Sequence, residues 1–139
     1  MKIAVVYWSS TGNTEAMAQA VLEGAKHAGA EAELFTAAEF DGGKMDEFDA
    51  VAFGCPAMGA EELEDGEFAP MFETCESKLS GKKIALFGSY GWGDGEWMRT
   101  WEENCRDKGA NLVCDSVICQ ETPDDEALSA CRSLGEALA

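Results

Sequence analysis

The turn at residues 9–14, Ser-Ser-Thr-Gly-Asn-Thr, joins an apolar run to a segment with helical periodicity. The run Ile3–Trp8 predicts a buried strand, and Met17, Val21 and Ala25 mark the apolar face of the helix that follows. A strand-to-helix turn exposes unpaired backbone N–H groups, and the helix dipole favours an anion there. Because the turn contains no Lys or Arg, a phosphate at this place would be held by neutral hydrogen bonds.

Apolar runs alternate with helical patterns along the whole chain. Continuously apolar strands are typical of parallel sheets covered on both faces, and the alternation predicts right-handed crossovers. We therefore expect a doubly wound α/β fold in a single domain, residues 1–139. The expected strands are Lys2–Trp8, Glu31–Phe35, Ala50–Gly54, Lys83–Ser89 and Asn111–Cys119. The expected helices are Thr14–Ala28, Phe68–Leu79, Glu96–Lys108 and Asp124–Leu138.

Two segments carry more local expectations. The stretch Thr36–Asp49 predicts a short irregular helix before the third strand. Thr122, Pro123 and Asp125 predict the start of the last helix, with Thr122 as N-cap, a first-turn proline and a reciprocal cap.

Three loops of unusual composition follow predicted strands. In a doubly wound sheet, ligands bind outside the carboxyl ends of the strands. The first loop is residues 9–14, the second is residues 55–62, and the third is residues 88–95, which contains four glycines around Tyr90 and Trp92. Glycine allows a ligand to approach the backbone, and an aromatic ring offers a flat stacking face. The three loops together favour a planar, phosphorylated ligand.

The charge balance restricts the classes of partner. The chain has 10 basic and 27 acidic residues, a net charge of −17. This charge disfavours nucleic acids and anionic membranes, and it favours a basic protein partner. No run approaches the roughly 18 apolar residues of a membrane span, and the N-terminus does not resemble a signal peptide, so we expect a cytoplasmic protein.

The cysteines do not have metal-site spacing. None of the six forms a Cys-x-x-Cys pair, and His27 is distant from all of them in sequence. This argues against a zinc or iron–sulfur site and favours free, buried thiols.

The motifs along the full chain resemble those of the short-chain, clostridial type of flavodoxin. The most specific are YWSSTGNTE at residues 7–15, GCPAMG at 54–59 and FGSYGWG at 87–93. The resemblance implies a three-layer, doubly wound, five-stranded parallel sheet of strand order 2-1-3-4-5. It also implies tightly but non-covalently bound FMN.

The resemblance also implies a role for each loop. Met58 would cover the inner face of the isoalloxazine ring, Trp92 would cover the outer face, and Glu61 would accept a hydrogen bond from the ring N3–H. The implied phosphate contacts are Ser9, Ser10, Thr11, Gly12, Asn13 and Thr14. The other implied contacts to the ring and ribityl chain are Pro56, Ala57, Gly59, Ala60, Ser89, Tyr90, Gly91 and Gly93. Two positions depart from close relatives: Ser10 stands where glycine is frequent, and Ala60 stands where a polar residue is frequent.

The expected function is one-electron transfer, since flavin supplies the redox chemistry and the protein supplies position and electrostatics. The Met58–Gly59 peptide can turn over at little steric cost, and a carbonyl turned towards N5 would favour the neutral semiquinone. No basic residue lies in the three loops, so the anionic hydroquinone would be disfavoured and the second potential would be very low. We expect a monomeric carrier, not an enzyme, that shuttles between semiquinone and hydroquinone for ferredoxin-dependent enzymes with basic patches.

Two other classes share this fold. A response-regulator receiver would need acidic residues at the end of the first strand and an Asp after the third, where this chain has Tyr7-Trp8 and Gly54-Cys55-Pro56. A flavin-dependent quinone or nitro reductase would use a nicotinamide cofactor, but no Gly-x-Gly-x-x-Gly follows a strand. A P-loop nucleotidase is excluded because Gly-Lys-Ser/Thr is missing after the first strand.

Overall fold

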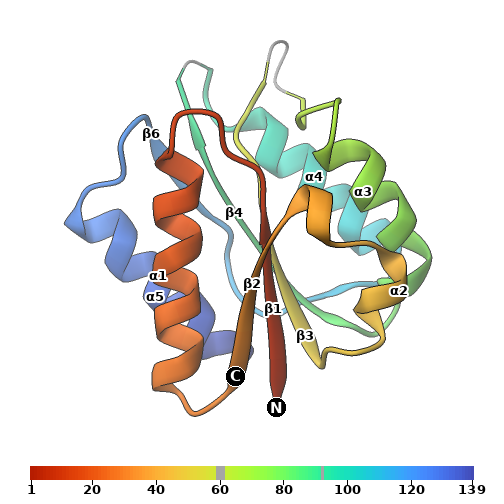
Figure 1. Ribbon diagram of the computed structural model, residues 1–139. Coiled ribbons are helices and arrows are strands. Elements are labelled where there is room, and N and C mark those ends of the chain that lie inside the picture. Colours follow the sequence, from red (N-terminus) through yellow and green to blue (C-terminus); the bar gives the residue numbers. More distant parts are fainter. Residues whose placement is uncertain (59–61, 92) are drawn as a thin grey trace.

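The computed structural model shows a parallel sheet between two layers of helices (Figure 1). The structure describes residues 1–58, 62–91 and 93–139. The strand order is β2-β1-β3-β4-β5, and β6 also pairs with β4, so the predicted order 2-1-3-4-5 is confirmed. The strands are β1 (Lys2–Tyr7), β2 (Glu31–Thr36), β3 (Ala50–Gly54), β4 (Lys83–Tyr90), β5 (Asn111–Leu112) and β6 (Val117–Gln120).

The central strands are apolar because helices cover both of their faces. In β3 every residue is buried, whereas the edge strand β2 has exposed and partly buried positions only. The register brings Tyr7 of β1 level with Thr36 of β2 and Gly54 of β3. The carboxyl ends of the strands therefore meet at one edge of the sheet, where the three loops of interest begin.

The helices divide into two layers (Figure 1) that enclose different cores. Beside α1 and α5 the core is built mainly from small and aliphatic side chains, while under α2, α3 and α4 it holds Phe53, Phe68, Trp97 and Trp101. Both tryptophans are buried, at 2% exposure each. The helices are α1 (Asn13–His27), α2 (Gly42–Met45), α3 (Phe68–Cys75), α4 (Glu96–Asp107) and α5 (Asp125–Leu138). Two 3₁₀ turns, Ala37–Glu39 and Glu76–Lys78, complete the helical segments.

Close backbone contact joins α1 to α5. A Cβ atom at Gly24 would lie 1.9 Å from the carbonyl oxygen of Arg132, and one at Gly135 would lie 2.1 Å from that of Val21. Only glycine permits this approach, because a methyl group at either position would overlap backbone atoms. Within the described residues, no helix is long and apolar enough to cross a membrane.

The structure corrects two sequence expectations. The predicted fifth strand, Asn111–Cys119, is interrupted, since β5 ends at Leu112 and β6 begins at Val117. The N-cap of α5 is Asp124, not Thr122, because the Asp124 side chain accepts the Ala127 N–H at 2.8 Å. The irregular helix expected within 36–49 is present as the first 3₁₀ turn and α2.

Candidate functional site

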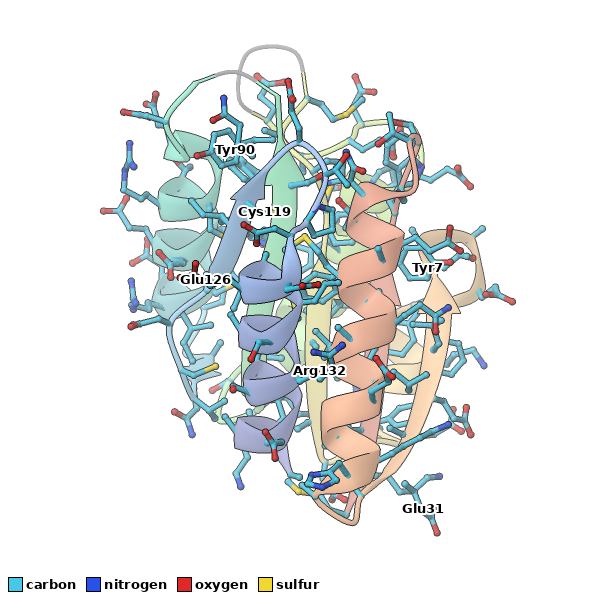
Figure 2. All side chains as sticks on the ribbon, turned by 90° about the vertical axis from the view of Figure 1, so that its left-hand side faces the viewer. Tyr7, Glu31, Tyr90, Cys119, Glu126 and Arg132 are labelled. Carbon is cyan, nitrogen blue, oxygen red and sulfur yellow. The ribbon has the colours of Figure 1, made fainter. Side chains whose placement is uncertain are left out.

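A cavity of about 240 Å³ lies at the carboxyl edge of the sheet. All three loops singled out in the sequence contribute to its wall, although they are far apart along the chain. Figure 2 shows Tyr90 of the third loop at the same end of the molecule as the start of α1, and Glu31 at the opposite end. The lining residues are Ser10, Thr11, Asn13, Pro56, Ala57, Met58, Ser89, Tyr90, Gly91 and Glu121.

The first loop presents an uncapped helix to this cavity. Gly12 is the N-cap of α1 with φ 92°, a left-handed conformation that suits glycine, and no side chain caps the helix. The Ser9 hydroxyl accepts the Gly12 N–H at 3.1 Å, which closes the turn. The first N–H groups of α1 have no intrahelical partners, and Ser10 and Thr11 line the cavity beside them, so this end of the helix is suited to an anion.

A pair of buried hydroxyls connects the first loop to the third. The Thr14 and Ser89 oxygens lie 3.1 Å apart, and the Ser89 N–H also points at the Thr14 oxygen at 3.4 Å. Thr14 is 1% exposed and Ser89 is 5% exposed. The Thr14 hydroxyl is therefore engaged inside the protein, and the pair fixes the start of α1 against the end of β4.

The described residues on the two sides of the second loop pair at an antiparallel bridge between Met58 and Glu62, here called the Met58–Glu62 hairpin. Met58 and Glu62 exchange two backbone hydrogen bonds, each 2.9 Å long. The Ala57 N–H donates to the Ser89 carbonyl at 3.1 Å, so one side of the hairpin is attached to β4. Three predicted site residues, Gly59, Ala60 and Glu61, lie outside the described residues.

The third loop contributes its aromatic residue and its backbone. The Tyr90 ring packs against Trp97, with ring centroids 5.5 Å apart, and the Gly91 carbonyl accepts a hydrogen bond from Gln120 at 3.3 Å. Gly93 is exposed and has φ 88°, outside the cavity lining. Trp92 lies outside the described residues.

Sequence reasoning missed Glu121, which follows β6 and lines the cavity. Its φ is 58°, a left-handed conformation that is uncommon for a residue with a side chain, and its N–H donates to the Tyr90 carbonyl at 2.7 Å. The signal was available, because the carboxyl end of the last strand must reach the same edge of the sheet as the other three.

The electrostatic character of the site is anionic or neutral. No Lys, Arg or His is among the described residues that line the cavity. A metal site is not indicated either, since the described residues contain no suitable group of three His, Cys, Asp or Glu side chains. The cavity wall combines the hydroxyl and N–H donors of the first loop with the apolar Pro56, Ala57 and Met58 of the second. This donor set fits a ligand with a phosphate and a flat, largely apolar ring.

The cysteines are free thiols, as the sequence predicts. All six cysteines are free, and four are buried, while Cys114 and Cys119 are partly buried. Burial raises the pKa of Cys55, Cys105 and Cys131 to about 12, which keeps these thiols protonated and unreactive.

The fold and the site together define a doubly wound α/β protein with a cavity at the carboxyl edge of the sheet, the place where ligands bind in such folds. A family model described as flavodoxin matches residues 5–135. The flavodoxin of Megasphaera elsdenii is 45% identical over 140 residues, covering 99% of this chain and 98% of the relative. The flavodoxin of Clostridium beijerinckii is 43% identical over 135 residues, covering 97% of each.

Solved structures agree with the sequence matches. The solution structure of two-electron reduced Megasphaera elsdenii flavodoxin has a TM-score of 0.89, covering 98% of this chain and 97% of that one. An archaeal flavodoxin, 30% identical, has a TM-score of 0.87. This chain belongs to the flavodoxin family.

Family membership settles the general function. The protein is an FMN-binding electron-transfer flavoprotein, and it is a carrier for redox partner proteins rather than an enzyme. The receiver and reductase alternatives are therefore rejected, and the expected resemblance to the short-chain, clostridial type is confirmed.

Proposed function

We propose that the cavity at the carboxyl edge holds FMN with its phosphate at the first loop. The uncapped start of α1 supports this placement, together with the hydroxyls that line the cavity beside it. In this arrangement Thr14 contributes its backbone N–H, because its hydroxyl is already paired with Ser89. The proposed phosphate contacts are Ser9, Ser10, Thr11, Gly12, Asn13 and Thr14.

The isoalloxazine ring would lie between the second and third loops. Met58 would cover its inner face, and the backbone from Ser89 to Gly91 would contact its polar edge, since all of these residues line the cavity. Trp92 on the outer face and Glu61 at the ring N3–H complete the proposal from the sequence pattern alone. The remaining contacts would come from Pro56, Ala57, Gly59, Ala60 and Gly93.

The proposed activity is low-potential transfer of one electron at a time. Bound FMN supplies the redox chemistry, and this chain supplies position and field. The observation that carries the proposal is a cavity whose described wall contains no basic residue, within a chain of net charge −17. Added negative charge on a ligand would meet like charge and partial desolvation there, so the second electron would enter only at a very low potential.

The proposed partners are ferredoxin-dependent enzymes that present a basic patch, and the protein would act as a cytoplasmic monomer. The acidic charge supports this choice, because opposite fields accelerate encounter and orient the two proteins. Electron transfer to such a partner should slow as salt screens the attraction.

Stepwise anaerobic reduction of the purified holoprotein, followed by its visible spectrum, tests this proposal. A one-electron carrier should pass from yellow through a persistent blue form before it bleaches. A protein that bleaches directly, in a single two-electron step, would refute the proposed one-electron role while leaving the family assignment intact.

A further inference from the structure

The Glu64 carboxylate is buried at the start of α3, with 9% of the residue exposed. One carboxylate oxygen accepts the Gly66 N–H at 2.7 Å, and the other accepts the N–H groups of Glu67 and Phe68 at 2.7 and 2.8 Å. These donors lie where a helix lacks internal partners and where its dipole favours an anion. The side chain of Glu67, the N-cap residue, makes no capping hydrogen bond. The carboxylate of Glu64, three residues upstream, caps the helix instead.

The backbone of Glu64 is tied to a second element. Its N–H donates to the Cys55 sulfur at 3.4 Å, and the Cys55 thiol points at the Pro56 carbonyl at 3.5 Å. The Trp97 indole N–H donates to the Cys55 carbonyl at 3.2 Å. Glu64 is therefore attached to the end of β3 and, through Cys55, to α4.

These attachments fix one side of the hairpin that lines the cavity. Glu62, which pairs with Met58, is separated from Glu64 by a single residue. The other side is fixed independently, through the Ala57 N–H bond to Ser89. With both sides anchored, the backbone of Met58 has a defined position before any ligand is bound.

We propose that Glu64 is a positioning residue of the FMN site: its carboxylate holds the Met58–Glu62 hairpin on the start of α3, so that the ring side of the cavity is formed in advance. This inference rests on the proposed placement of the ring beside Met58. If this wall of the cavity is already formed in the apoprotein, flavin binding does not have to supply the free energy of ordering it. If the wall is formed in only a fraction of the molecules, the apparent flavin affinity is reduced by that fraction.

The test uses the variant Glu64→Gln with Glu62→Gln as its matched control. An amide retains one acceptor oxygen but turns N–H donors towards an N–H of the helix start, so E64Q loses at least one charge-assisted hydrogen bond. E62Q removes the same charge from an exposed side chain of the same hairpin. Each apoprotein is titrated with FMN and with riboflavin, which has the ring but no phosphate.

E64Q should bind both flavins more weakly by a similar factor, roughly tenfold, the consequence of one lost hydrogen bond to a charged acceptor. The visible circular dichroism of the bound flavin, which reports on the surroundings of the ring, should change in E64Q. In E62Q the riboflavin affinity and the dichroism should match those of the wild type.

Three results would overturn the inference: equal affinities for E64Q and E62Q, a loss confined to FMN, or a loss of apoprotein stability with unchanged flavin affinity. Equal affinities would mean that Glu64 acts only through its charge, as Glu62 does. A loss confined to FMN would mean that Glu64 affects the phosphate and not the ring. A loss of stability alone would mean that Glu64 stabilises the fold without shaping the site. If the wild-type apoprotein bound neither flavin, the proposed function itself would fail, an outcome distinct from these three.

Discussion

The buried hydroxyl pair of Thr14 and Ser89 makes a quantitative prediction. Thr14→Val exchanges a hydroxyl for a methyl group of similar size, so it removes the 3.1 Å contact without opening a cavity. The Ser89 hydroxyl and its N–H then lose a partner in a place that is 5% exposed. An unsatisfied buried group costs about 1–3 kcal/mol, and we expect T14V to reduce the free energy of unfolding by that amount.

A double-mutant cycle at Thr14 and Ser89 measures the energy of the contact between the two hydroxyls. Ser89→Ala should cost about 1 kcal/mol, because it removes the side-chain partner of the Thr14 hydroxyl and leaves it only the longer contact with the residue 89 N–H. If the two groups satisfy each other, the combined variant should cost less than the sum, with a coupling energy of about 1 kcal/mol. Urea unfolding of the apoproteins, followed by circular dichroism, measures all four states, with unchanged m-values as the check on two-state behaviour.

Thr100→Val is the control for the exchange itself, because Thr100 is an exposed residue of α4. It should change stability by no more than about 0.5 kcal/mol. Additive effects of T14V and S89A, within about 0.5 kcal/mol, would refute the reasoning, since the hydroxyls would then be satisfied by other groups.

Two further predictions concern packing and pH. Gly135→Ala should destabilise the apoprotein by about 1–3 kcal/mol or more, because its Cβ would lie 2.1 Å from the backbone oxygen of Val21. Gly43→Ala should cost clearly less, since its Cβ would lie 3.2 Å from a side-chain oxygen of Asp41. Equal losses for the two variants in urea unfolding would contradict this prediction. Burial opposes ionisation of Glu64, but three backbone N–H groups prevail and lower its pKa below the ordinary 4.5, so its stabilisation is complete above that pH and is lost as the pH falls through the folded-state value. Unfolding free energies measured from pH 7 to pH 3 should therefore show the difference between wild type and E64Q shrinking in acid, and a constant difference would be the contrary result.

The main elements of the fold could be predicted because the local signals agree with the tertiary environment. Each central strand is apolar on both faces, and β3 occupies the predicted residues Ala50–Gly54. The helices follow apolar spacing that the packed structure uses directly. The start of the last helix was predicted wrongly, since Asp124 and not Thr122 caps α5.

The last strand shows why periodicity fails at an interruption. Cys114 and Cys119 would face opposite sides of a continuous strand, yet both pack against the core beside α1 and α5. The chain leaves the β4 ladder after Leu112 and returns at Val117, which resets the alternation. Ser116 is used in that gap, where its hydroxyl donates to Glu102 at 2.7 Å. A tertiary contact of this kind leaves no periodic signal.

The site was predictable as three loops but not as a connected structure. Hydroxyls, glycines and Met58 are ordinary turn and packing residues one by one, and they indicated a site because they follow three strands that end at the same edge of the sheet. The partners that hold the loops in place, such as the Glu64 carboxylate, are side chains whose sequence context is an ordinary acidic run. Their role depends on which backbone N–H groups lie opposite, and that is decided only by folding.

The contacts around the site converge on the end of β4. Ser89 holds the first loop through the Thr14 hydroxyl and the second through the Ala57 N–H, while the Tyr90 carbonyl holds the segment after β6 through the Glu121 N–H. Tyr90 lies beside the carboxyl end of β6 in Figure 2. Since β4 is buried along most of its length and is paired on both sides, the sheet holds it firmly in place. Four segments that differ in sequence are thus attached to the same strand, which gives the cavity they line a defined shape.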